Sequence, residues 1–169
     1  MITIRNENYQ DIPAIRWVNE LAFESNAEAD LVEALRVSGA PLISLVAQEG
    51  DQVVGHIMFS PVTIQSEKES FSAAGLGPMA VLPDWQGKGI GSQLVRRGLE
   101  ECRLAGYQAA VVLGHPWFYP HFGFMPSVQW GIRWEHEAPE EAFMALELIP
   151  RSLAGRSGIV KFMSQFEGV

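Results

Sequence analysis

Apolar and polar positions alternate along this chain with two different periods, and these periods predict its helices and strands. Ile2 and Ile4 alternate with polar residues, which indicates a short strand. Asp11 then stands where a helix N-cap is expected, and a second helix spans Glu28 to Val37 before Gly39 ends it. The residues predicted to face inward from these two helices are Ile15, Val18, Leu21, Ala22, Leu31, Val32, Leu35 and Val37.

Residues 42–82 change to the period of strands. Three apolar segments are separated by turns at residues 50–51 and 66–69, so we expect three antiparallel strands. Pro78 lies inside the third segment, and proline has no N–H to donate to a strand ladder. A local break or bulge is therefore expected there.

A further helix and strand follow. Gly106 ends a helix over residues 88–105, and residues 107–114 then read as a buried strand. A strand–helix–strand unit normally lays its two strands parallel. Beyond this point the sequence is irregular and aromatic until an edge or hairpin strand at 143–148. The pattern predicts an α/β fold with one domain over residues 1–169. The apolar stripe of the helix is Ile90, Leu94, Val95, Leu99, Cys102 and Ala105.

Composition narrows the class of protein. A chain with 47% hydrophobic and 19% charged residues is typical of a compact domain with a single core. A net charge of −8 argues against a nucleic-acid binder, which needs a basic face, and the longest apolar runs are too short to span a membrane. Cys102 has no disulfide partner and the start carries no apolar signal segment, which favours the cytoplasm. The histidines and Cys102 show no metal-ligand spacing, so no metal is expected.

The most informative segment is PDWQGKGIG, residues 83–91, between a strand and a helix. Gly87, Gly89 and Gly91 remove side chains where the helix begins, so backbone N–H groups can approach an anion such as a pyrophosphate. A nucleotide-hydrolase phosphate loop would need Ser or Thr after Lys88. A dinucleotide fingerprint would need its third glycine one position later and an acidic residue at the end of the next strand. The remaining alternative is a tight turn that binds nothing.

The neighbours of these glycines favour one ligand. Gln86, Gly89 and Gly91 fill the pattern Q/RxxGxG/A, and the segment resembles the acyl-CoA loop of the GNAT superfamily of N-acyltransferases. The order of predicted elements is also similar. The segments EADLVEALR, VVLGHPWFYPHFGF and EEAFMALEL look like a bacterial subgroup labelled YhbS-like. The resemblance implies a single GNAT-type domain, with a mixed, mostly antiparallel sheet that is splayed at the acyl-CoA site and flanked by helices.

The same resemblance implies which residues hold the cosubstrate, acetyl-CoA. The backbone of the strand before the loop would bind the pantetheine arm, and a strand N–H near Val81 would polarise the thioester carbonyl. The amides of the loop would bind the pyrophosphate, with the charge of Lys88 nearby. The implied cofactor-binding residues are Met79, Ala80, Val81, Gln86, Gly87, Lys88, Gly89, Ile90, Gly91 and Ser92.

Tyr119 is the candidate catalytic acid. It stands four residues before Gly123 and five before Phe124, in the spacing YxxxGF, where GNAT enzymes often place a tyrosine that protonates the departing thiolate. A phenol stays protonated at neutral pH and suits this basic leaving group. The alternative is that Tyr119 is one more ring of an aromatic cluster with Trp117, Phe118 and Phe122.

Acetyl transfer to an amine also needs a base, which the sequence leaves unassigned. Relatives often carry an Asn before the tyrosine, whereas this chain has His115 in that neighbourhood. We expect direct attack of a primary amine in a ternary complex, because no Cys or Ser nucleophile motif is present. An acyl-CoA sensor without catalysis, another acyl group and a homodimer stay open. The candidate bases are His56, His115, His121, Glu24 and Glu28.

Overall fold

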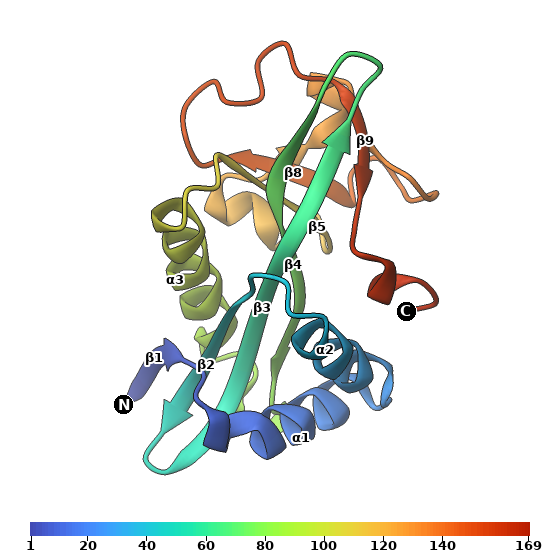
Figure 1. The fold of residues 1–169 in the computed structure, drawn as a ribbon. Coiled ribbons are helices and arrows are strands. Elements are labelled where there is room, and N and C mark those ends of the chain that lie inside the picture. Colours follow the sequence, from blue (N-terminus) through green and yellow to red (C-terminus); the bar gives the residue numbers. More distant parts are fainter. The chain divides into compact units, whose positions relative to one another are not determined.

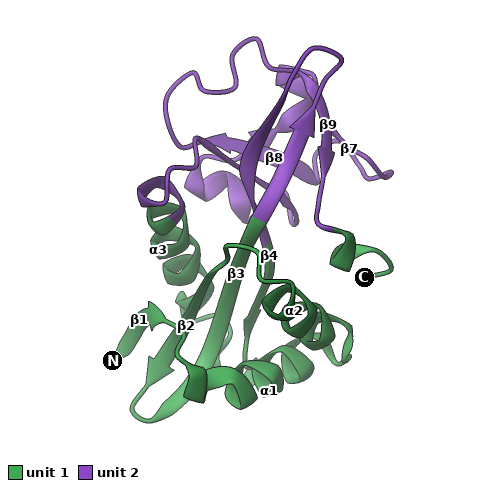
Figure 2. Ribbon diagram, viewed as in Figure 1, with its two compact units in different colours: residues 1–60, 77–101, 164–169 green, residues 61–76, 102–163 purple.

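The computed structural model describes all 169 residues, and their contacts group into two compact units (Figure 2). Unit 1 contains residues 1–60, 77–101 and 164–169, and unit 2 contains residues 61–76 and 102–163. Two strands and one helix pass from one unit into the other. Each unit is built from separate stretches of chain, so no linker segment marks the boundary between them. The single domain over residues 1–169 stays a prediction.

Unit 1 contains the two N-terminal helices and the antiparallel strands that the sequence predicts. α1 and α2 contact each other (Figure 1). β1 pairs with β2 and β2 with β3, both antiparallel, with a register shift between Ala47 and Gln48. The bounds are β1 Ile2–Asn6, α1 Ile12–Phe23, α2 Ala27–Val37, β2 Ile43–Glu49, β3 Gln52–Gln65, β4 Ser70–Val81 and α3 Ile90–Leu104.

The inward face of the first two helices differs from the prediction at two positions. Asn19 of α1 is fully buried with Ile15 and Val18, so the buried stripe follows the i, i+3, i+4 spacing and leaves Leu21 41% exposed. Val37 is the last residue of α2 and is 87% exposed, because the helix ends there. Both residues were predicted to face inward, and this was wrong.

Asp11 occupies the N-cap position of α1, but its side chain does not cap that helix. Its carboxylate accepts hydrogen bonds from the Asn8 N–H at 2.7 Å and from the Arg5 guanidinium at 2.7 and 2.9 Å. The hydrogen bonds from Arg5 are the largest cause of a lowered pKa at Asp11. The residue therefore fixes the turn before α1 rather than the helix itself.

Helices cover both faces of β3 in unit 1. A Cβ on Gly55 would lie 3.1 Å from Leu94 and 3.3 Å from Ile90, both on α3, so this glycine lets the helix approach the strand closely. The side chain of the next residue, His56, contacts Asn19 of α1. Successive strand residues point to opposite faces, so α3 covers one face and α1 the other.

The helix α3 matches its predicted stripe at every position except the last. Ile90, Leu94, Val95, Leu99 and Cys102 are all buried. Ala105, predicted on the same stripe, is exposed because the helix ends at Leu104. The chain then turns at Gly106, which has a φ of 97° and donates its N–H to the carbonyl of Arg103 at 3.1 Å.

Unit 2 contains the parallel strand pair that the sequence predicts, together with three short strands that it does not. β4 pairs in parallel with β5, and β5 pairs antiparallel with β8. The predicted strand at 143–148 is β8, but it lies between β5 and β6 instead of at an edge. The missed strands are too short to show a period. The bounds are β5 Ala109–Leu113, β6 Met125–Pro126, β7 Ile132–Trp134, β8 Phe143–Glu147 and β9 Gly158–Lys161.

Hydrogen bonding orders the strands β1-β2-β3-β4-β5-β8-β6, with β9 paired to both β3 and β7. The sheet is mixed and mostly antiparallel, as predicted. β4 continues through Pro78 as a strand, with a cis Gly77–Pro78 peptide and a φ of 149° at Gly77. None of the helices combines the length and the apolar character that crossing a membrane requires. Short 3₁₀ turns lie at Tyr9–Asp11, Pro83–Trp85, Tyr119–Phe122, Ser127–Trp130 and Ser164–Phe166.

Candidate functional site

The end of β4 extends beyond the strand that pairs with it. In the parallel register Leu76 pairs with Val112, and β5 ends one residue later at Leu113, whereas β4 continues to Val81. On the β3 side, the Leu82 N–H donates to the carbonyl of Val54 at 2.9 Å. Strand backbone beyond the end of a neighbour offers N–H and C=O groups to an extended ligand.

A glycine turn connects this strand to α3. Gly87 and Gly89 have φ values of 76° and 82°, a region that favours glycine, and nothing lies within 4 Å of where their side chains would be. Gly91 differs, because it lies inside the first turn of α3. The three glycines of the motif therefore act in two ways: two set the path of the chain and one keeps the helix start free of a side chain.

Several backbone amides at the start of α3 have no hydrogen-bond partner within the helix. The first intrahelical hydrogen bond is from the Gln93 N–H to the carbonyl of Gly89 at 3.1 Å, so the amides of residues 90–92 come before the helical ladder. The side chain of Ile90 is buried, which anchors this end of the helix. Unpaired amides together with the positive end of the helix dipole form an anion-binding site.

Two side chains shape the turn. The Nε2 atom of Gln86 donates to the carbonyl of Val81 at 2.9 Å and so ties the turn to the end of β4. Lys88 is exposed, and its Nζ atom lies 5.3 Å from the ring centroid of Trp85. Lys88 thus supplies a positive charge to the same turn.

Tyr119 lies in unit 2 and is only 7% exposed. Its ring meets Phe118 and Phe124 edge to face, with centroid distances of 5.0 and 5.7 Å. Burial raises the pKa of Tyr119 to about 12. The phenol is therefore protonated at neutral pH. Trp117, predicted in the same cluster, instead stacks on His115 and is 70% exposed.

Gly114 is a residue of this region that the sequence did not single out. The ring of Tyr119 fills the space that a side chain at Gly114 would occupy. The N–H of Gly114 donates to the carbonyl of Ala142 at 2.9 Å. A glycine directly after a buried strand was the available signal, but only the fold shows that an aromatic ring lies against it.

The five candidate bases differ in how far they are buried. His56 is fully buried, whereas Glu24, His115 and His121 are exposed. Glu28, in the first turn of α2, is half-buried, and its Oε1 atom is buried without a hydrogen-bond partner. An unpaired buried acceptor costs free energy unless a ligand or water satisfies it.

His56 belongs to a buried polar network instead. Its Nδ1 atom lies 3.2 Å from Asn19 Nδ2, and its Nε2 atom lies 2.9 Å from Ser44 Oγ. Ser44 also donates to Glu7, which accepts two hydrogen bonds from Arg36 at 3.0 and 3.1 Å. Burial, followed by the charge of Arg36, lowers the pKa of His56 to about 3. Both ring nitrogens are engaged, which does not favour His56 as a base.

Comparison with known proteins assigns the class. Residues 41–126 match the acetyltransferase (GNAT) domain, and the chain belongs to this family. Over 164 residues it is 37% identical to the uncharacterized N-acetyltransferase YhbS of Escherichia coli strain K12, covering 96% of this chain and 97% of that protein.

Two solved structures are similar over nearly the whole chain. A crystal structure of YhbS from Escherichia coli in complex with CoA has a TM-score of 0.92 at 37% identity, covering 98% of this chain and 91% of that chain. A GNAT family acetyltransferase from Brucella melitensis in complex with acetyl-CoA has a TM-score of 0.81 at 38% identity, covering 99% of both chains. The resemblance inferred from the glycine turn is thus confirmed at the level of family and fold.

Proposed function

We propose that this protein transfers an acetyl group from acetyl-CoA to a primary amine by direct attack in a ternary complex. The observation that carries the proposal is the glycine turn before α3, where backbone amides and Lys88 favour an anion. Two relatives with 37% and 38% identity are described in complex with CoA and acetyl-CoA. In this proposal the amides from Gly87 to Ser92 bind the pyrophosphate of acetyl-CoA.

The end of β4 would hold the rest of the donor. Met79, Ala80 and Val81 lie beyond the end of β5, so their backbone can pair with the pantetheine arm as a strand would. The N–H of Val81 would donate to the thioester oxygen as negative charge develops on it. Gln86 supports this arrangement because it holds the carbonyl of Val81.

Tyr119 is proposed as the proton donor to the CoA thiolate. Its spacing to Gly123 and Phe124 supports this role, and so does its protonation, since burial raises the pKa of Tyr119 to about 12. A donor must carry its proton when the thiolate leaves. The tight contact with Gly114 holds the ring in one orientation.

Glu28 is the base that we would test first. Its buried Oε1 atom has no hydrogen-bond partner, and an attacking amine or a bridging water could supply one. The other carboxylate candidate, Glu24, is exposed at the C-terminal end of α1. We expect Glu28→Gln to lower kcat and to leave acetyl-CoA affinity unchanged.

A turnover assay with acetyl-CoA and a panel of primary amines tests the proposal. Tyr119→Phe should lower kcat by about 100-fold, because general-acid catalysis contributes about that factor, while the Kd for acetyl-CoA stays the same. Tyr107→Phe is the matched control, since Tyr107 is a half-buried tyrosine of unit 2 outside the motif. Equal kcat values for wild type and Tyr119→Phe would remove Tyr119 as the acid. Saturable acetyl-CoA binding without turnover of any amine would favour a sensor.

A further inference from the structure

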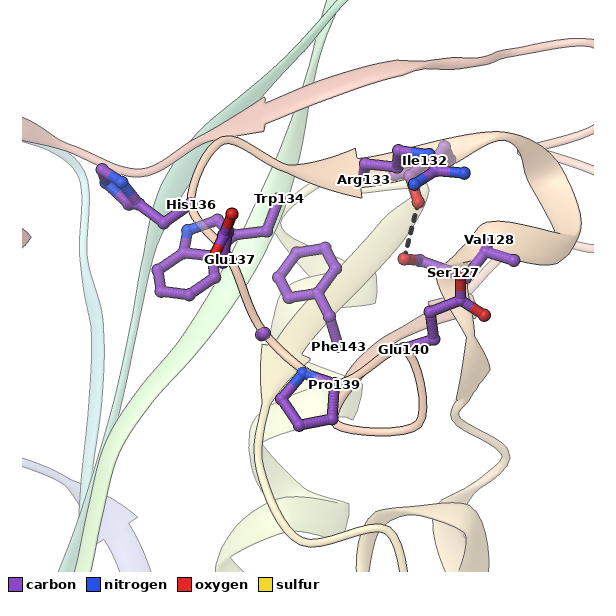
Figure 3. A pocket seen from close by; sticks show the side chains of 11 residues that line it. Ser127, Val128, Ile132, Arg133, Trp134, His136, Glu137, Pro139, Glu140 and Phe143 are labelled. Carbon is purple, nitrogen blue, oxygen red and sulfur yellow. Dashed lines mark hydrogen bonds between the residues drawn. The ribbon is translucent and has the colours of Figure 1, made fainter.

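Unit 2 contains a cavity that the proposed acetyl-CoA residues do not line. Its volume is about 610 Å³, and every residue that lines it lies between Ser127 and Phe143 (Figure 3). This volume lies within the range of about 300–1,000 Å³ that is typical of small-molecule sites. The cavity is therefore a candidate site in its own right.

Aromatic rings form one part of the cavity wall. The rings of Trp134 and Phe143 are nearly parallel, with centroids 6.2 Å apart and planes 13° apart. Phe143 is buried, whereas Trp134 is only half-buried and keeps part of its ring open. An accessible indole ring attracts apolar groups and, through its π-face, cations.

Carboxylates supply the charge of the same cavity. Glu137 and Glu140 both line it and both are exposed. Arg133 is the one lining residue with a fixed positive charge, and it lies exposed on β7. Two carboxylates against one guanidinium, in a chain of net charge −8, favour a cationic ligand over an anionic one.

Hydrogen bonds hold the loops around the cavity. The buried Ser127 donates through Oγ to the carbonyl of Ile132 at 2.7 Å (Figure 3). The Ala142 N–H donates to the carbonyl of Pro139 at 2.9 Å, which closes the acidic loop just before Phe143. Both ends of the lining segment are thus fixed by the fold, so the cavity is formed before a ligand arrives.

We propose that this cavity binds an organic ammonium ion, with the cation near Glu137 and the hydrocarbon part against Trp134, while Glu140, on the other side of Phe143, adds negative charge to the cavity (Figure 3). Neither wall alone defines the ligand: carboxylates alone would suit any cation, and aromatic rings alone would suit any apolar group. Together they select a molecule with an ammonium group and an apolar body. The inference goes beyond the proposed acetyl transfer, because it requires no acetyl-CoA.

Benzyltrimethylammonium is the probe for this site, because it is a quaternary ion that cannot be acetylated. Titration calorimetry without acetyl-CoA should show saturable binding, and the neutral benzyl alcohol should bind at least about 10-fold more weakly. The double variant Glu137→Gln/Glu140→Gln should lose about 10-fold in affinity and most of its salt dependence. Glu141→Gln is the matched control, since Glu141 is exposed on the same loop but does not line the cavity.

Trp134→Ala should also lose about 10-fold in affinity for the probe, whereas Trp117→Ala, which removes an exposed tryptophan outside the cavity, should not. Trp134 contributes to the core of unit 2, so circular dichroism of each variant accompanies the titration. Equal affinity of wild type and the double glutamine variant, or equal affinity for benzyltrimethylammonium and benzyl alcohol, would overturn the proposal.

The ammonium ion has two possible sources, the acceptor amine or a cation that is not acetylated. Competitive inhibition of amine turnover by benzyltrimethylammonium, with KM raised and kcat unchanged in the double glutamine variant, identifies the acceptor. Non-competitive inhibition identifies a separate regulatory cation. Either type of inhibition supports ammonium binding in this cavity. Failure of all turnover would remove the proposed function, but the binding measured without acetyl-CoA would stand.

Discussion

The turn from β4 into α3 and the segment from Gly114 to Phe143 are built in opposite ways. The turn, in unit 1, offers backbone: two glycines with positive φ, a helix start and amides outside the helical ladder. The segment, in unit 2, offers side chains: the enclosed ring of Tyr119 and the cavity lined by Trp134 and two carboxylates. A site made of backbone restricts the residue types that can form it, whereas a site made of side chains depends on which loops meet.

This difference explains why the sequence alone predicted the glycine turn but not the cavity. Glycine at φ values of 76° and 82° cannot be replaced without strain, so the motif appears directly in the sequence. Trp134 and Phe143 are separated by an acidic loop, and nothing in their spacing indicates that their rings stack. The following experiments test whether the contrast between backbone and side chains holds.

Substitution of Gly89 should have the largest effect. Gly89→Glu adds strain at a positive φ and a negative charge where the pyrophosphate is proposed, so we expect the Kd for acetyl-CoA to rise at least about 100-fold. Gly39→Glu is the matched control, since Gly39 has a φ of 76° and equally open surroundings. Calorimetry with unchanged affinity in Gly89→Glu would remove the pyrophosphate site from the turn.

Gly114→Ala tests the packing around Tyr119. The added methyl group meets the tyrosine ring, so the free energy of unfolding should fall by about 2 kcal/mol, within the range for overpacked sites. In a Tyr119→Ala background the methyl group has room, so the same substitution should cost much less. Urea unfolding of the four proteins measures this difference. An equal cost in both backgrounds would show that the ring is not held by Gly114.

The buried network around His56 predicts a pH dependence within unit 1. Its pKa is about 3 in the folded protein and 6.5 as the ordinary value, so the unfolded chain binds more protons between these values. Stability is then greatest above pH 6.5 and falls as the pH falls, by about 1.4 kcal/mol between pH 7.5 and 5.5. Urea unfolding of His56→Gln should show a flatter pH profile. Parallel profiles would contradict the assignment.

Gln86→Ala should have the smallest effect. It removes one exposed hydrogen bond to the carbonyl of Val81, which is worth about 0.5–1 kcal/mol. We expect acetyl-CoA affinity to fall by about 3-fold. Gln52→Ala, an exposed glutamine at the start of β3, serves as the control. A loss as large as that of Gly89→Glu would mean that the Gln86 side chain binds the ligand itself.

Particular residues show how much of the fold could be predicted from the sequence. The stripe from Ile90 to Cys102 and the ends of α2 and α3 could be predicted, because period and glycine stops are local properties. The short strands β6, β7 and β9 could not, since two to four residues carry no period and form strands only through their partners. Leu21 shows the same limit, because a buried Asn19 shifted the inward face of α1.

By itself the sequence determined the order of the main elements, the glycine turn, the family that this turn indicates and Tyr119 as a candidate. These depend on backbone dihedrals, helix and strand periods and residue spacing, all of which act between near neighbours in the chain. Only the tertiary structure decided that Gly114 lies under Tyr119, that His56 is enclosed by Asn19 and Ser44, and that Trp134 shares a cavity with two carboxylates. Those contacts join distant residues or loops without a period, so their burial and charge follow from packing and not from local pattern.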